Sequence, residues 1–139
     1  MKYRYERHPV VCNLCGGHVK LVDNAQIYGQ RYGSGYAYIC MKCGARTGTH
    51  INSPDVALGI LSNDEMRRWK TKCHNRFDAL WKGQGKYAKS IRDDLYFELS
   101  KLLHIPEHCC HFGHFDIDML KEAYGKIEVL EQMRERGEI

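Results

Sequence analysis

Four cysteines in two Cys-x-x-Cys pairs are the residues of this 139-residue chain that specify a chemistry most directly. The pairs are Cys12 with Cys15 and Cys40 with Cys43, and a glycine follows each pair. This spacing lets both thiolates of a pair reach one cation, while the glycine relieves strain where the chain doubles back. Two such knuckles supply four soft ligands for one tetrahedral Zn²⁺. The site is closed, so its metal holds a fold together and does not activate water.

The sequence supports disulfides or an iron–sulfur cluster less well than it supports zinc. The chain has seven cysteines, an odd number for a disulfide framework, and it begins with no secretory signal peptide. An iron–sulfur cluster is the main competitor, because it also accepts four thiolates. We predict one structural zinc ion that contributes on the order of 10 kcal/mol to folding. Reduced cysteines predict a cytoplasmic location, and the absence of a long apolar run predicts no membrane partner.

A second candidate metal cluster combines His50 with Cys110, His111 and His114. Imidazole and thiolate are zinc ligands, but this spacing matches no paired-knuckle pattern. Phenylalanines at positions 112 and 115 favour a packed turn before the last helix instead. The sequence leaves this second site open.

His50 and His74 raise another alternative, an HNH-like nuclease in which a bound metal activates water. Such a site needs a tight strand–loop–helix unit, whereas residues 51–61 intervene here and include a proline. The chain also lacks a phosphate-binding P-loop and a nucleophile elbow. The sequence therefore favours a protein without catalytic activity.

A tyrosine- and arginine-containing loop is the candidate contact for nucleic acid. Tyr28, Arg31 and Tyr32 lie between glycines in residues 27–33. Exposed aromatic rings stack on bases at about 1–3 kcal/mol each, and arginine binds phosphate. Arg67 and Arg68 add basic residues on a predicted helix. The alternative is that the tyrosines cover the thin core of a small metal domain.

Charge is distributed unevenly along the chain. Residues 1–54 carry seven Lys or Arg and two Asp or Glu, and residues 55–89 carry eight and four. Residues 90–139 carry six and eleven. This asymmetry indicates a side that faces a polyanion, or two oppositely charged faces that attract one another.

The cysteines and the loop must be positioned by strands. Period-two alternation predicts strands at residues 18–22 and 36–39, and residues 45–50 form a short return strand. Residues 2–8 alternate aromatic and basic side chains and form a strand or an N-terminal arm. This pattern is the plan of a zinc ribbon covering residues 1–54.

Residues 55–139 follow a helical period. Apolar side chains recur at three- and four-residue steps and predict three helices. Capping sequences at Ser62–Glu65 and Ser90–Asp93 and a cap at Asp116 mark the helix starts, and Pro106 ends the second helix. The predicted fold class is α+β, with the helical region packed on the ribbon as one compact unit.

With these motifs, residues 12–131 resemble small phage and prophage proteins described as zinc-finger-containing domains of unknown function. The shared pieces are the first knuckle, Ile27 to Gly33, Cys40 to Ala45, Gly48 to His50, Leu58 to Leu61, the helix around Arg67, and Cys110 to Asp116. The resemblance implies zinc at the four cysteines and a viral origin, which would place the protein in the host bacterial cytosol. It implies no reaction.

The leading hypothesis is a non-enzymatic, zinc-binding module that binds nucleic acid as a phage accessory factor. The alternative is a viral factor that captures or inhibits a host protein. For that alternative, the acidic C-terminal third would mimic nucleic acid.

Overall fold

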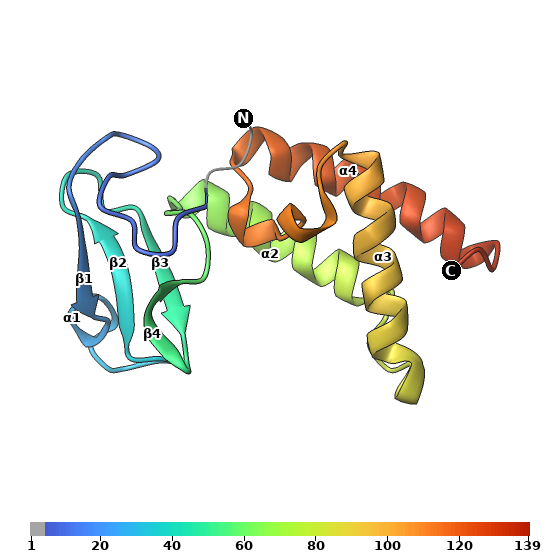
Figure 1. Ribbon diagram of the computed structural model, residues 1–139, viewed down its shortest axis with the longest axis horizontal. Coiled ribbons are helices and arrows are strands. Elements are labelled where there is room, and N and C mark those ends of the chain that lie inside the picture. The colour runs from blue at the N-terminus through green and yellow to red at the C-terminus, as the bar shows by residue number, and fades with distance from the viewer. Residues whose placement is uncertain (1–4) are drawn as a thin grey trace. The chain divides into compact units, whose positions relative to one another are not determined.

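A computed structural model of the chain describes residues 5–139 (Figure 1). Four antiparallel strands precede three long helices, which confirms the predicted α+β class. The described residues divide into two compact units, residues 5–67 and residues 68–139, named here the sheet unit and the helical unit. The prediction for residues 2–4 lies outside the described residues. No helix among residues 5–139 combines the length and apolarity needed to cross a membrane.

The sheet unit is built on four strands in sequential order, each antiparallel to its neighbour. The strands are β1 Val19–Asp23, β2 Tyr36–Cys40, β3 Arg46–His50 and β4 Ser53–Ala57. The first three agree with the prediction to within one residue at each end. β4 was not predicted, because Pro54 and Asp55 are unfavourable in most strands. An edge strand tolerates them, since proline there removes no ladder hydrogen bond.

The core of the sheet unit joins the cysteines to the sheet. Val19, Tyr38, Ala57 and Leu61 are buried together with two of the cysteines. Asn13, within the first knuckle, donates to the Leu61 carbonyl at 3.0 Å and accepts from the Leu61 N–H at 2.9 Å. This pair of hydrogen bonds fixes the first knuckle to the segment that follows β4.

The helical unit packs three helices around buried phenylalanines. The elements are α2 Asp64–Asp78, which begins in the sheet unit, η1 Gly85–Tyr87, α3 Ala88–Leu102, η2 Glu107–Cys109, η3 Phe112–His114 and α4 Ile117–Glu135. Phe112 lies 5.5 Å from Phe77 and 5.9 Å from Phe115 between ring centroids, in edge-to-face pairs. All three rings are at most 1% exposed, as expected for the predicted packed turn.

The helix starts differ from the prediction in two of three cases. Ser62 is not the cap of α2, because its N–H and carbonyl pair with Arg46 at 2.9 and 3.1 Å. Asn63 takes that role, and its Oδ1 accepts the Met66 N–H at 2.9 Å. α3 begins before the predicted Ser90 box, as a continuation of η1. Asp116 caps α4 as predicted, accepting from the Met119 N–H at 2.9 Å.

Candidate zinc centre and tyrosine loop

The four cysteine sulfurs converge on one point. All lie within 4.8 Å of one another, with Cys12 Sγ 3.7 Å from Cys43 Sγ and Cys15 Sγ 3.4 Å from Cys40 Sγ. Four thiolates about 2.3 Å from one Zn²⁺ in a tetrahedron would lie roughly 3.8 Å apart. A cluster with several irons and sulfides between the thiolates needs wider separations. The donor set therefore fits one structural zinc ion, as predicted.

Both knuckles use the same backbone hydrogen bonds. The first cysteine of each knuckle donates its N–H to the carbonyl of the residue five positions later, and its own carbonyl accepts from the N–H of the glycine four positions later. These bonds measure 2.8 and 2.9 Å in the first knuckle and 2.8 and 3.0 Å in the second. Gly16 and Gly44 have φ values of 76° and 79°, a region that favours glycine. The glycine in each motif thus closes the turn that aims two sulfurs at the metal.

Backbone N–H groups also point at the sulfurs. Cys12 Sγ accepts from Leu14 N–H and Cys15 Sγ from Gly17 N–H, each at 3.3 Å. Cys40 Sγ accepts from Cys43 N–H at 3.4 Å and Lys42 N–H at 3.3 Å. The hydrogen bond from Cys43, with that from Lys42, lowers the pKa of the Cys40 thiol to about 6. At Cys40 these dipoles favour the thiolate form, which is the form that binds a metal.

Gly17 lets the two knuckles approach. A Cβ at this position would lie 2.7 Å from Lys42 Cβ and 2.9 Å from Cys40 Sγ. The equivalent residue of the second knuckle is Ala45, which is buried. Gly17 was not among the predicted site residues, although the Gly-Gly pair after the first knuckle was a usable signal.

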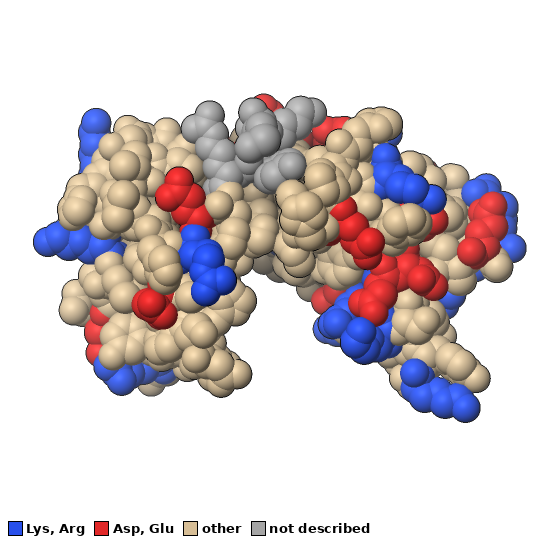
Figure 2. Space-filling model, viewed as in Figure 1, with Lys and Arg blue, Asp and Glu red and all other residues tan. Residues whose placement is uncertain are grey.

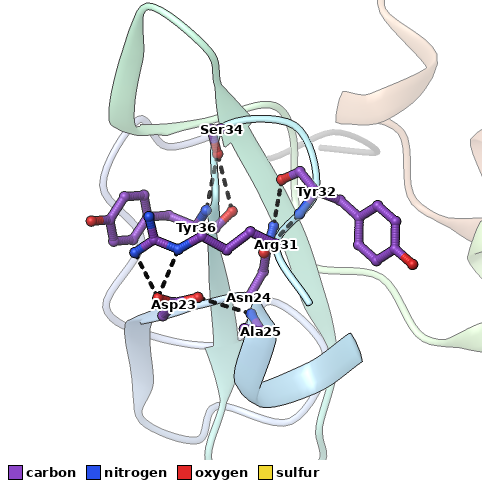
Figure 3. Close-up of polar contacts among 7 residues, drawn as sticks. All are labelled: Asp23, Asn24, Ala25, Arg31, Tyr32, Ser34 and Tyr36. Carbon is purple, nitrogen blue, oxygen red and sulfur yellow. Dashed lines mark hydrogen bonds and ion pairs between the residues drawn. The ribbon is translucent and has the colours of Figure 1, made fainter. Parts of the chain in front are cut away.

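The loop between β1 and β2 holds both predicted tyrosines, Tyr28 and Tyr32, and Figure 3 draws Tyr32. It contains the one-turn helix α1 Ala25–Tyr28, preceded by the buried Asn24. Asn24 donates to the Tyr32 carbonyl at 2.7 Å and accepts from the Tyr32 N–H at 3.1 Å. A buried amide therefore fixes the backbone of the loop and leaves its aromatic rings outside.

Tyr28 and Tyr32 form an exposed pair. Their side chains are 47% and 53% exposed, and their rings meet edge to face at 5.7 Å. Arg46 donates from Nε to the Tyr28 hydroxyl at 3.1 Å, and its guanidinium lies 5.4 Å from the Tyr28 ring centroid. Tyr28, Tyr32 and Arg46 are named here the tyrosine platform. Arg46 was not predicted, because it follows the second knuckle and lies 18 residues from Tyr28.

Two of the predicted basic contacts are ion-paired. Arg31 donates to Asp23 Oδ2 from Nε at 2.9 Å and from Nη2 at 2.6 Å, and it lies over the Tyr36 ring (Figure 3). The Arg31 hydrogen bond lowers the pKa of Asp23. Arg67 pairs with Asp64 and donates to the Ser62 carbonyl, so it stabilises the start of α2. Arg68 is exposed on α2.

The residues of the second candidate cluster are divided between the two units. His50 is exposed at the end of β3, while His111 and His114 lie in the helical unit with rings 4.8 Å apart. Burial raises the pKa of the Cys110 thiol to about 12, which disfavours its thiolate. Among residues 5–139, only the four knuckle cysteines form a group of three or more metal-ligating side chains. His74, proposed for a nuclease site, packs edge to face on Phe112 at 5.0 Å.

Comparison with known proteins gives one match. A family model described as a zinc-finger-containing domain matches residues 8–130, a range that holds all four cysteines and most of α4. No curated protein and no solved structure matches the chain.

Proposed function

Because the chain belongs to the family of zinc-finger-containing domains, we propose that its sheet unit, stabilised by zinc, binds single-stranded nucleic acid. The protein is a non-enzymatic accessory factor of a phage or prophage in this proposal. The observation that carries the proposal is the tyrosine platform, with two half-exposed rings held by a rigid loop. Unpaired bases stack on such rings, and the guanidinium of Arg46 is suited to a neighbouring phosphate.

Charge alone would give this unit little affinity. Residues 5–67 contain six Lys or Arg and five Asp or Glu. Four thiolates around one Zn²⁺ add a net negative charge, and Arg31 and Arg67 are already paired with carboxylates. The platform must therefore bind mainly by stacking, and base stacking contributes affinity without a large salt dependence.

The test is binding of a fluorescein-labelled oligothymidylate to the zinc-loaded full chain, followed by fluorescence anisotropy. Replacing Tyr28 and Tyr32 together by alanine should weaken binding at least about tenfold, since each stacked base contributes roughly 1–3 kcal/mol. Both rings are half-exposed, so thermal unfolding of the variant should match that of the wild type.

Phe97 provides the matched control. Its ring is 46% exposed, has the Lys101 ammonium 4.9 Å from its centroid and lies on α3 among acidic residues. Phe97→Ala removes an equally exposed aromatic ring and should leave binding unchanged. Wild-type affinity in the Tyr28→Ala/Tyr32→Ala variant, or no binding by the wild type, would refute the proposal.

Exposed apolar side chains at the knuckles favour a second candidate, a protein partner. Val10, Val11 and Met41 are 61%, 62% and 59% exposed. His18 connects them, because it forms an antiparallel β-bridge with Val11 and its carbonyl accepts from the Met41 N–H. A host protein that covered these side chains should remain bound to the purified chain after nuclease treatment. Met41→Glu should then release it, whereas Phe97→Glu should not.

A further inference from the structure

A strongly basic segment connects α2 to α3 in the helical unit. Residues 79–92 contain Lys82, Lys86, Lys89 and Arg92 and no acidic residue. The segment runs from the end of α2 through η1 into the first turns of α3. Figure 2 shows Lys and Arg side chains at the projecting end of the helical unit where α3 begins. Residues 79–92 are named here the basic tip.

Two aromatic rings lie among these cations. Trp81 is oriented by a hydrogen bond from its Nε1–H to Asp78 Oδ1 at 3.0 Å. The Arg92 guanidinium and the Lys82 ammonium lie 5.3 and 5.9 Å from its ring centroid. Tyr87 is 60% exposed, and the Lys86 ammonium lies 5.2 Å from its ring. Both rings therefore have a positive charge beside them, and Tyr87 also has an exposed surface on which a base can stack.

Two of the four cations are available for an external anion. Lys82 is paired with Asp78 at 3.7 Å and Lys89 with Asp93 at 2.8 Å, the carboxylates that flank the tip. Within the part of the chain that the structure describes, Lys86 and Arg92 contact aromatic rings and have no carboxylate at ion-pair distance. A phosphate near these two side chains would meet cations that form no ion pair. Asp93, whose pKa is lowered first by Lys89 and at longer range by Arg92, offsets only part of this charge.

We propose that the basic tip is a second contact for single-stranded nucleic acid, with Lys86 and Arg92 on phosphates and Tyr87 stacked on a base. This inference rests on the proposed function and supplies what the sheet unit lacks. The sheet unit carries stacking rings but almost no net charge, whereas the tip alternates cations and rings along one segment. Alternating phosphates and bases are the chemical pattern of a single strand.

The first experiment measures the salt dependence of oligothymidylate binding by the full chain. Each phosphate contact contributes about 0.7 to the slope of log affinity against log salt for single strands. Lys86→Gln with Arg92→Gln should therefore reduce the slope by about 1.4. The control is Lys101→Gln, because Lys101 also lies over an exposed ring but is paired with Glu98 at 2.9 Å. Its slope should equal that of the wild type.

The second experiment separates stacking from charge. Tyr87→Ala should weaken oligothymidylate binding roughly fivefold or more, as expected for the loss of one stacked base. The same variant should bind an abasic phosphate strand of equal length as well as the wild type does. Equal loss on both strands would overturn the stacking role, and an unchanged salt slope in Lys86→Gln/Arg92→Gln would overturn the phosphate role.

The outcomes distinguish this inference from the proposed function. If Tyr28→Ala/Tyr32→Ala weakens binding and the tip variants do not, the tip inference fails and the tyrosine platform stands. If only the tip variants weaken binding, the platform fails and the tip stands. Binding of the wild type to phosphatidylserine vesicles but to no oligonucleotide would overturn both.

Discussion

Replacing Gly17 by alanine should weaken zinc binding without removing any ligand. The added Cβ would lie 2.7 Å from Lys42 Cβ, 2.9 Å from Cys40 Sγ and 3.2 Å from Cys15 Sγ. Lys42 Cβ is attached directly to the backbone of the second knuckle, and the two sulfurs are held by the metal. None of these atoms is the free end of a flexible side chain, so the knuckles themselves must move apart.

The required movement can be compared with what a zinc site accepts. Opening the Lys42 contact from 2.7 Å to the 3.4 Å at which ordinary contacts begin needs a shift of about 0.7 Å. Metal–ligand distances vary by only about 0.2 Å. Overpacking of this kind costs about 1–3 kcal/mol, which corresponds to roughly 5- to 150-fold weaker zinc binding. Structural zinc sites bind with about 10–16 kcal/mol, so the variant should still load.

The assay is a competition titration of zinc against a coloured chelator. Gly125→Ala is the control, because a Cβ at that position in α4 would meet no atom within 4 Å apart from its chain neighbours and the backbone of its own helix. This substitution should leave the zinc affinity unchanged and stabilise the protein by up to about 1 kcal/mol through helix propensity. A zinc affinity of Gly17→Ala within twofold of the wild type would refute the reasoning from close approach.

Three further predictions concern zinc, pH and helix capping. Chelation of zinc, or Cys40→Ser, should remove on the order of 10 kcal/mol from the sheet unit. NMR dispersion should then collapse for residues 5–67 and persist for residues 68–139, and uniform persistence would contradict a structural zinc. The hydrogen bonds that Arg76 donates to Glu131, at 2.9 and 2.6 Å, lower the pKa of that carboxyl from 4.5. This contribution is complete above pH 4.5 and is lost as pH falls through the lowered pKa. The wild-type melting temperature should thus fall more steeply below pH 4.5 than that of Glu131→Gln. Parallel curves of melting temperature against pH would contradict a stabilising ion pair between Arg76 and Glu131. Asp116→Ala should cost about 1 kcal/mol in urea unfolding. Asp118→Ala, an acidic first-turn residue without the capping bond, should cost less, and equal costs would exclude capping as the cause.

The sequence was sufficient for features that depend on local spacing. Cysteine spacing determines which sulfurs can share a metal, so all four zinc ligands were predicted, whereas the close approach at Gly17 was not. Hydrophobic periodicity located three strands and three helices, because burial of one face imposes that period. Asp116 was recognised as a cap because its side chain bonds a backbone group only three residues away.

Features that depend on tertiary pairing were not predictable in the same way. Whether Arg31 is available to bind a phosphate depends on its ion pair with Asp23 at the end of β1. The sequence shows both residue types but not that they are in contact. Asn63 replaced Ser62 as the cap because β3 pairs with the backbone of Ser62. Arg46 belongs to the tyrosine platform because β3 places its guanidinium beside Tyr28. In each case a partner distant along the chain decided the role.

The unequal burial of the four ligands has a consequence for how the metal is exchanged. Cys12 and Cys40 are 3% and 2% exposed, Cys15 is half-buried and Cys43 is exposed. An incoming thiol or chelator therefore meets Cys43 first and can replace the ligands one at a time from that edge. Oxidants reach the same sulfur, since thiolate reactivity follows exposure. We therefore expect replacement of the zinc ligands to begin at Cys43, the most exposed of the four cysteines.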